Sequence, residues 1–367
     1  MSALFSPIKL RGLALANRIV ISPMCQYSSV RGEAQAWHMI HLGSLSLSGA
    51  GMLCIEATAV TREGRITPGD LGLFDDATEG ALRHVLGAIR KHSNIPVTIQ
   101  LAHAGRKASC YLPWEGGAQI PLDNGGWRTQ APSAFPQNPG ETPPVALDKE
   151  GLALVRDAFV VAAQRAARLG IDGIEIHNAH GYLLHEFLSP VSNRRDDAYG
   201  GSLENRMRFP LEVFDAVRAA FPAERPVGVR VSASDWMEGG WDIDQTIAFA
   251  EQLKARGADW LDASSGGISP AQKIAPGPGF QVPFAEAVKK ATGITTMAVG
   301  MITDPHQAED IIASGKADLV AMARAMLYDP HWPWHAAAEL GGTVDAPPQY
   351  WRSAPQEHKD LFRNARR

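Results

Sequence analysis

Three observations predict that this chain is an α/β protein folded as a closed (β/α)8 barrel, or TIM barrel. Eight short apolar segments that resemble strands are each followed by a segment with helical periodicity. Several of these strands are near-continuous apolar runs, which is typical of a parallel sheet covered on its outer face. No Gly-x-Gly-x-x-Gly follows any strand, which argues against the structural rival, an open doubly wound sheet. Eight right-handed βα units close into a barrel, and one such domain accounts for residues 1–367.

The elements follow one another in a regular order. The turn-rich residues 1–17 are predicted to form an N-terminal hairpin that caps the barrel. Strands are expected at 18–24, 52–60, 97–103, 173–177, 227–233, 260–264, 295–299 and 319–323. Helices are expected at 38–48, 76–91, 148–169, 202–220, 242–256, 282–291, 304–313 and 332–340. Ser202 is a suitable N-cap, and Asp304-Pro305 combines a cap residue with a proline in the first turn.

Two segments lie outside this repetition. Residues 106–147, after the third strand, are rich in Gly, Pro, Trp and Asn and show little periodicity. A segment of this length inside a compact domain is usually functional, so we expect a lid or insertion here. Residues 341–367 form a proline-rich tail.

Composition narrows the class of protein. The net charge of −4 argues against a nucleic-acid surface or a polybasic membrane patch. No secretory signal pattern is visible at the N-terminus, and no apolar run is long enough to span a membrane. Three widely separated cysteines form neither a disulfide framework nor a metal motif. We therefore expect a reduced, cytoplasmic protein.

The fourth strand delivers a polar cluster, His177-Asn-Ala-His-Gly-Tyr182. His177 and His180 converge if the chain leaves the sheet after His177 and turns in a helical sense. A zinc site needs three or four ligands, and no third ligand is well placed. Beside a zinc site, two other readings are open: structural histidines, or a pair of donors that bind and polarise a carbonyl oxygen. In the second reading Tyr182 acts as general acid.

Gln100 and Arg230 alternate with apolar residues and are predicted to point into the barrel. Arg230 either pairs with a buried carboxylate such as Glu175 or receives an anionic ligand at the barrel mouth. Gln100 either fills an interior layer or bonds the imide edge of a heterocycle, since it offers both a donor and an acceptor.

The ends of the seventh and eighth strands carry Gly300 and Arg324. This is the usual phosphate site of such barrels, although Arg324 could instead pair with Asp329 on the surface. Cys25, beside a proline at the end of the first strand, is either a small buried apolar side chain or a thiol that contacts a cofactor or substrate.

These motifs together resemble the Old Yellow Enzyme family of FMN-dependent ene-reductases, in its thermophilic-like subclass, which includes bacterial xenobiotic reductases. The resemblance covers nearly the whole chain. It is carried by Asn17-Arg-Ile-Val-Ile-Ser-Pro-Met-Cys-Gln-Tyr27, Glu56-Ala-Thr-Ala-Val60, Gln100-Leu-Ala-His-Ala-Gly-Arg-Lys107, His177-Asn-Ala-His-Gly-Tyr182, Ser189-Pro-Val-Ser-Asn-Arg-Arg195, Tyr199-Gly-Gly-Ser202 and Arg230-Val-Ser-Ala-Ser-Asp235.

The resemblance implies a role for each matching position. The residues that would contact FMN are Ser22, Pro23, Met24, Cys25, Ala57, Gln100, Arg230, Gly300, Ala323 and Arg324. His177 and His180 would bind the substrate carbonyl with help from Tyr27, and Tyr182 would donate the proton. Arg352 would enter a neighbouring subunit's site in a homodimer or homotetramer. Ala323 stands where many members have glycine, and the tail runs 15 residues past Arg352.

The implied activity is reduction of the activated C=C bond of α,β-unsaturated carbonyl compounds (enones, enals, maleimides), and of nitro xenobiotics as a further class. NADPH or NADH would reduce FMN and leave before the acceptor binds, and no metal is implied. Two alternatives stay open: a flavin-free barrel lyase or aldolase that uses Lys107, and a flavin-binding barrel without catalysis.

Overall fold

The computed structural model describes residues 2–363 and contains a closed barrel of eight parallel strands. In order around the barrel these are β3 (Ile19–Ile21), β4 (Met52–Ala59), β5 (Val97–Ala102), β8 (Gly173–Asn178), β9 (Val227–Ser232), β10 (Leu261–Ser264), β11 (Thr296–Ala298) and β12 (Leu319–Met322). Pairing of β12 with β3 closes the sheet. The barrel prediction is confirmed, and the open doubly wound sheet is wrong.

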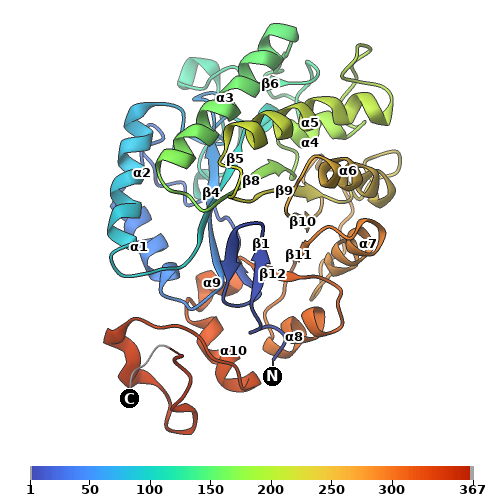
Figure 1. Ribbon diagram of the computed structural model, residues 1–367. Helices are drawn as coiled ribbons and strands as arrows, with labels where there is room; N and C mark the ends of the chain where they lie inside the picture. Colours follow the sequence, from blue (N-terminus) through green and yellow to red (C-terminus); the bar gives the residue numbers. More distant parts are fainter. Residues whose placement is uncertain (1, 364–367) are drawn as a thin grey trace.

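Helices surround the barrel on its outer face (Figure 1). Eight of them follow the strands as expected: α1 (Ala36–Ser46), α2 (Asp76–Ile89), α3 (Lys149–Arg168), α5 (Leu203–Ala220), α6 (Ile243–Ala255), α7 (Val282–Thr292), α8 (Pro305–Ala313) and α10 (Trp332–Leu340). Two short helices, α4 (Leu183–Leu188) and α9 (Arg324–Tyr328), were not predicted. The predicted caps are present, because Ser202 and Asp304 accept hydrogen bonds from the backbone N–H groups of Asn205 and Gln307.

An antiparallel hairpin, β1 (Ile8–Leu10) and β2 (Leu13–Leu15), packs against one end of the barrel. Its Leu10 and Leu15 belong to a buried apolar layer inside the barrel, together with Val20, Met52, Trp260, Met297, Val299, Leu319 and Ala321. The hairpin and this layer plug the N-terminal end of the barrel. The chemistry is therefore confined to the opposite, carboxyl end of the strands.

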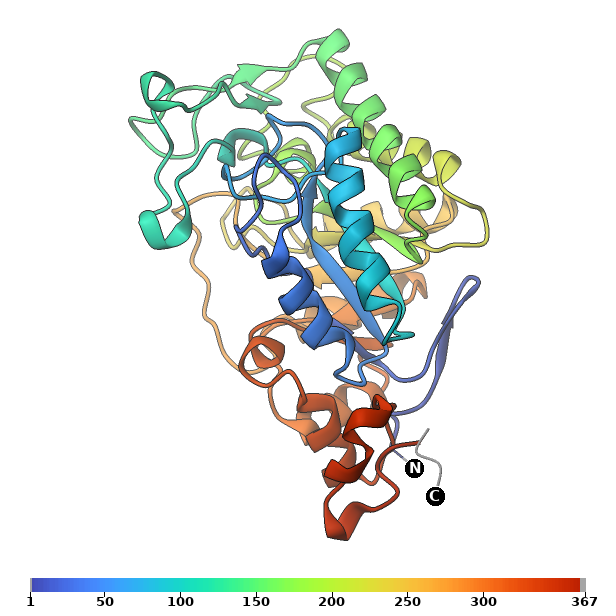
Figure 2. The same cartoon turned by 90° about the vertical axis from the view of Figure 1, so that its left-hand side faces the viewer.

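The segment 106–147 is the long irregular excursion that the sequence predicts. It contains only short elements: η1 (Gly105–Lys107), η2 (Pro113–Glu115), η3 (Leu122–Asn124), β6 (Gln130–Ala131) and β7 (Val145–Ala146). Several bonds tie it to the rest of the chain, among them two at β6 and just after it: His103 Nε2 lies 3.0 Å from Gln130 Oε1, and Arg195 Nη1 donates to the carbonyl of Pro132 at 2.9 Å. Figure 2 shows this segment, in teal, projecting at the upper left of the molecule.

The tail folds back on its own barrel. It contains η4 (Pro348–Ser353) and η5 (Gln356–His358), and the Phe362 ring lies 4.9 Å from that of Trp334 on α10. Both views place the tail, in red, at the end of the molecule away from segment 106–147 (Figures 1 and 2). The last four predicted tail residues, 364–367, lie outside the described residues. Across residues 2–363, no helix is long and apolar enough to cross a membrane.

Candidate active site

A row of polar side chains crosses the barrel interior above the apolar plug. The strand register pairs Gln100 with Glu175, and Arg230 with both His177 and Asp262. Gln100 Nε2 donates to Glu175 Oε1 at 2.8 Å, and Trp260 Nε1 donates to the other oxygen at 3.2 Å. The expected inward orientation of Gln100 and Arg230 is therefore observed.

The partner of Arg230 differs from the one that we suggested. Arg230 Nε lies 3.3 Å from Asp262 Oδ2, whereas Glu175 is bonded by Gln100 and Trp260. Burial raises the pKa of Asp262, and Arg230 opposes that rise. Burial, with Asp262 adding to it, raises the pKa of Glu175 to about 7. Arg230 therefore pairs with a buried carboxylate, as one of the two readings expected, but the carboxylate is that of Asp262 and not of Glu175, because the β9–β10 register sets Asp262 directly beside the guanidinium.

The two histidines lie together as predicted, with ring centroids 5.1 Å apart and planes at 85°. The backbone N–H of Ala179 donates to His177 Nδ1 at 3.2 Å, so the ring proton of neutral His177 lies on Nε2. His180 Nε2 lies 2.7 Å from Ser264 Oγ. Burial first, and then the charge of Arg230, holds the pKa of both histidines well below the usual range. Both are therefore neutral donors.

Tyr182 completes the cluster from the other side, with its ring 5.0 Å from that of His177. Lys107 Nζ lies 5.1 Å from the Tyr182 ring and donates to the carbonyls of His180 and Gly267 at 2.8 and 3.1 Å. Burial raises the pKa of Tyr182 well above its ordinary value, and nearby acidic groups add to that shift. The phenol therefore keeps its proton at neutral pH.

Tyr27 and Cys25 follow the end of β3. Burial raises the pKa of both side chains. Tyr27 also makes an edge contact with Trp114 of segment 106–147, with ring centroids 5.9 Å apart. Tyr27 lines a cavity of about 400 Å³ under that segment, together with Ile66, Thr67, Arg106, Lys107, Cys110, Tyr111, Pro113, Gly116, Gly117, Gln119, Gln137, Asn138 and Glu141.

The residues at the strand ends fit a flat, polar cofactor with a phosphate. Ser22 Oγ is buried and makes no hydrogen bond within residues 2–363, and the buried Arg230 Nε has only the ion pair with Asp262 at 3.3 Å. Gln100 uses Nε2 for Glu175, which leaves Oε1 to accept the imide N–H of a flavin. Pro23, Met24 and Cys25 are half-buried beside Ser22, and Ala57 is buried at the end of β4. The chemistry of these groups suits FMN.

The predicted phosphate site, at the ends of β11 and β12, has a glycine and an exposed arginine that suit an anion. Gly300 follows β11 with φ of 124°, a conformation that favours glycine. Arg324 is exposed and makes no ion pair in the described part of the chain, because Asp329 is bonded to His335 at 2.6 Å instead. The suggested Arg324–Asp329 pair is therefore wrong. Ala323 has φ of −106°, so its methyl group introduces no backbone strain.

Arg352 is the one candidate that this chain does not bring to its own site. It lies exposed on η4 in the tail, at the end of the molecule away from segment 106–147 (Figures 1 and 2). Among residues 2–363, no three His, Cys, Asp or Glu side chains gather in a way that could hold a metal ion.

Several polar residues around the site were missed from the sequence. Asp262 pairs with Arg230, and Glu56 accepts from the backbone N–H of Gln26 at 2.9 Å and lies 3.3 Å from His38 Nε2. Gln281 accepts from Ser265 Oγ at 2.6 Å and donates to the carbonyl of Val299 at 3.1 Å. Strand alternation could have indicated Asp262, which shares the inward parity of Ser264.

Comparison with known proteins gives the class. Residues 3–341 match the NADH:flavin oxidoreductase / NADH oxidase family. The chain belongs to this family. It is 44% identical to the NADPH dehydrogenase of Geobacillus thermodenitrificans, over 96% of this chain and 98% of that one. It is 43% identical to the NADPH dehydrogenase of Listeria monocytogenes, over 96% and 99%.

Solved structures agree with this assignment. Morphinone reductase superposes with a TM-score of 0.77 at 28% identity, over 95% of this chain and 91% of that chain. 2-Naphthoyl-CoA reductase superposes with a TM-score of 0.82 at 25% identity, over 93% of this chain and 52% of that chain. The predicted Old Yellow Enzyme resemblance is confirmed, as are an FMN-dependent oxidoreductase class and a nicotinamide reductant.

Proposed function

We propose that this protein uses NADPH to reduce the activated C=C bond of α,β-unsaturated carbonyl compounds, namely enones, enals and maleimides, with nitro xenobiotics as a further acceptor class. The observation that carries the proposal is the neutral His177–His180 pair beside a protonated Tyr182. The names of the NADPH dehydrogenases that it resembles favour NADPH over NADH.

Bound FMN supplies hydride transfer, first from the nicotinamide and then to the β-carbon of the acceptor. The protein's own groups handle the charge that develops on the carbonyl oxygen. His177 can donate its Nε2–H to this oxygen, because Nδ1 already accepts from the backbone N–H of Ala179 and the ring proton is therefore on Nε2. His180 supports the same oxygen when Ser264 donates to its Nε2, which leaves the proton on Nδ1. Neutral N–H dipoles held in place stabilise such an oxyanion without prior rearrangement.

Tyr182 is the proposed proton donor to the α-carbon. Its raised pKa keeps the phenol protonated until carbanion character develops next to it. Tyr27 assists at the carbonyl and, with Cys25, lines the flavin. On the cofactor side, Ser22, Pro23, Met24, Ala57, Gln100 and Arg230 would hold the isoalloxazine, and Gly300, Ala323 and Arg324 the phosphate. Arg230 offsets negative charge on the reduced ring.

Three wider features belong to the same proposal. The whole chain acts as one barrel domain, with segment 106–147 as a lid over the cavity that Tyr27 lines. The exposed Arg352 reaches a neighbouring subunit's site in a homodimer or homotetramer. The enzyme works in the cytoplasm.

One anaerobic experiment tests the function. Protein reconstituted with FMN is expected to be yellow, to be bleached by NADPH and to be reoxidised by 2-cyclohexenone. His177→Ala is expected to slow reoxidation about 100-fold, as loss of an oxyanion donor typically does. A non-catalytic flavin protein would show no enone-dependent reoxidation in the wild type, and that outcome would reject the proposal.

The flavin-free lyase or aldolase is not favoured. Lys107 Nζ already donates to two backbone carbonyls, and a Schiff base at Lys107 would break both bonds. Burial lowers the pKa of Lys107 to about 8, and burial alone explains this shift without a nucleophilic role. Borohydride with a ketone substrate is expected to leave the mass of Lys107 peptides unchanged.

A further inference from the structure

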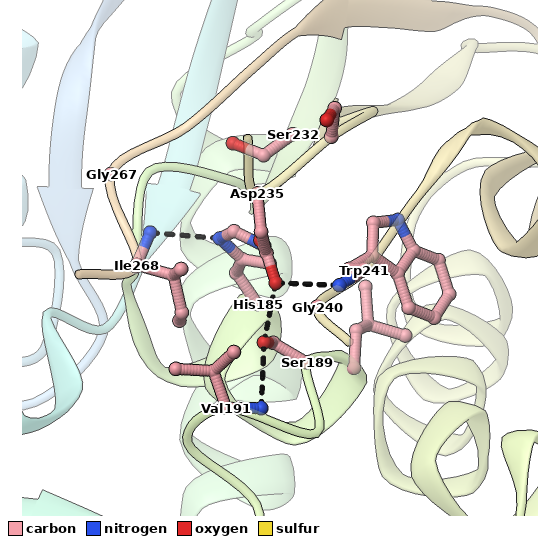
Figure 3. A network of polar contacts seen from close by, with 12 residues as sticks. His185, Ser189, Val191, Ser232, Asp235, Gly240, Trp241, Gly267 and Ile268 are labelled. Atoms are coloured by element: carbon pink, nitrogen blue, oxygen red, sulfur yellow. Dashed lines mark hydrogen bonds and ion pairs between the residues drawn. The ribbon is translucent and has the colours of Figure 1, made fainter. Parts of the chain in front are cut away.

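A second histidine–carboxylate pair lies just behind the proposed site and has no role in the reaction described above. His185 is on α4 and Asp235 is in the loop after β9, and both side chains are fully buried. His185 Nε2 lies 2.9 Å from Asp235 Oδ1. Figure 3 shows the imidazole directed at this carboxylate, which in turn lies between Ser189 and Trp241.

The hydrogen bonds define where the protons lie. The backbone N–H of Gly181 donates to His185 Nδ1 at 2.9 Å, so Nδ1 carries no proton and Nε2–H donates to Asp235. Asp235 Oδ2 accepts from Ser189 Oγ at 2.6 Å and from the Trp241 backbone N–H at 2.7 Å. Burial raises the pKa of Asp235, but His185 and these donors outweigh it and leave the pKa below its ordinary value.

The group that His185 holds is the turn between the catalytic side chains. His180 and Gly181 have φ of 60° and 74°, so two successive residues adopt the left-handed conformation, which is unfavourable for histidine. Three side chains hold this turn. Ser232 Oγ accepts from His180 N at 2.9 Å, Lys107 bonds the His180 carbonyl, and His185 accepts from the next N–H.

The turn also has little freedom to move elsewhere. A Cβ on Gly181 would lie 2.1 Å from the Gly267 carbonyl oxygen, so the backbone of the turn packs directly on the loop after β10. Its geometry decides where the rings of His180 and Tyr182 lie around His177, at 5.1 and 5.0 Å. A change at the Gly181 N–H therefore displaces both rings.

We propose that His185 and Asp235 act as one positioning unit: Asp235 selects the His185 tautomer that accepts from Gly181, and this bond holds His180 and Tyr182 in place for the acceptor carbonyl. The proposal rests on the proposed function for the identity of that carbonyl. It concerns residues that touch neither the acceptor nor the predicted flavin contacts.

The test uses the FMN-loaded enzyme, four single variants and the double variant His185→Leu/Asp235→Asn. His185→Leu removes the acceptor for Gly181 N–H. His185→Asn keeps an oxygen near the position of Nδ1. Asp235→Asn introduces an amide donor that must oppose either Trp241 N–H or the required His185 tautomer. His84→Leu, at an exposed histidine of α2, is the matched control.

The principal readout is the affinity for para-hydroxybenzaldehyde, an unreactive carbonyl compound, followed by the change in flavin absorbance. We expect His185→Leu and Asp235→Asn to weaken binding about 10-fold, as loss of a buried hydrogen bond does. His185→Asn should recover most of the affinity, and the double variant should be no worse than the poorer single variant because the two residues act together. FMN content and His84→Leu should match the wild type.

Unchanged affinity in folded, FMN-loaded His185→Leu would overturn the proposal, as would additive losses in the double variant. A fall in melting temperature with unchanged affinity would assign the pair a structural role only, which also overturns it. Failure of the proposed function would look different: the wild type itself would not turn over 2-cyclohexenone, while ligand affinities could still be compared.

Discussion

Arg230 and Asp262 are register partners on adjacent strands, and Nε of one lies 3.3 Å from Oδ2 of the other inside the barrel. The positive charge of the guanidinium thus has a carboxylate partner within the protein before any cofactor binds. Glu175 lies on β8, the strand on the other side of β9. It accepts hydrogen bonds from Gln100 and Trp260, and burial raises its pKa to about 7. Arg230 is therefore a buried cation that is paired with Asp262 and can still bind an anionic group at the carboxyl end of the strands.

Breaking this ion pair is expected to destabilise the protein. Arg230→Met leaves Asp262 buried without a partner, which should lower the free energy of unfolding by about 3 kcal/mol. Asp262→Leu in the same background should restore most of it, since two apolar groups then replace the pair. Urea unfolding with and without added FMN separates this effect from cofactor loss. Equal stability of the single and double variants would contradict it.

Gly228 is required by the indole of Trp260. A Cβ at Gly228 would lie 2.0 Å from a Trp260 ring atom, and Trp260 is fully buried in the plug. Gly228→Ala should therefore cost about 1–3 kcal/mol, as overpacking of a core does. The control is Gly87→Ala on α2, where nothing lies within 4 Å and the change should stabilise the helix by about 0.5–1 kcal/mol. Thermal unfolding should show a lower melting temperature than wild type for Gly228→Ala and a higher one for Gly87→Ala.

His103 should make stability fall in acid. Burial lowers its pKa to about 4 from the ordinary 6.5, so the unfolded chain binds more protons between these values. The contribution of His103 is therefore complete above pH 6.5 and is lost as the pH falls towards 4. It amounts to about 3 kcal/mol at most.

This pH dependence is tested by the difference in unfolding free energy between wild type and His103→Asn at each pH. Asp70 and Glu186 have pKa values raised to about 7 and about 8 by burial, so they act in the opposite direction over part of the same range. These effects cancel when wild type and His103→Asn are compared at each pH. Parallel profiles of unfolding free energy would exclude His103 as the cause.

Trp114 is expected to influence large acceptors more than small ones. Its ring contacts Tyr27 edge-on at 5.9 Å but is itself two-thirds exposed, at 66%. Trp114→Ala removes an aromatic pair worth about 0.5–1.5 kcal/mol and widens the cavity beside Tyr27. KM for a bulky enone should change several-fold, while kcat with 2-cyclohexenone stays within about twofold, as steady-state kinetics would show. Trp127→Ala, in the same segment but bonded to the Glu63 carbonyl, serves for comparison.

The strands, helices and candidate residues of the barrel could be predicted because they depend on local periodicity and on residue type. Inward-facing Gln100 and Arg230 follow from strand alternation, and convergence of His177 and His180 follows from a turn after the strand. The partner of Arg230 could not be predicted, because alternation does not reveal which residue of the next strand lies opposite. His185 was missed for a similar reason. It lies on the short helix α4. One of its partners, Asp235, is far away in the sequence and the other is the backbone N–H of Gly181, so no spacing in the sequence indicates His185.

The plug formed by Leu10, Leu15 and the layer above them gives the molecule a face that takes no part in chemistry. Substitutions of Leu10 and Leu15 are expected to act on unfolding alone, whereas Trp260 of the same layer also bonds Glu175, the partner of Gln100. A protein engineer could raise heat resistance from the hairpin side while altering acceptor range from the opposite side.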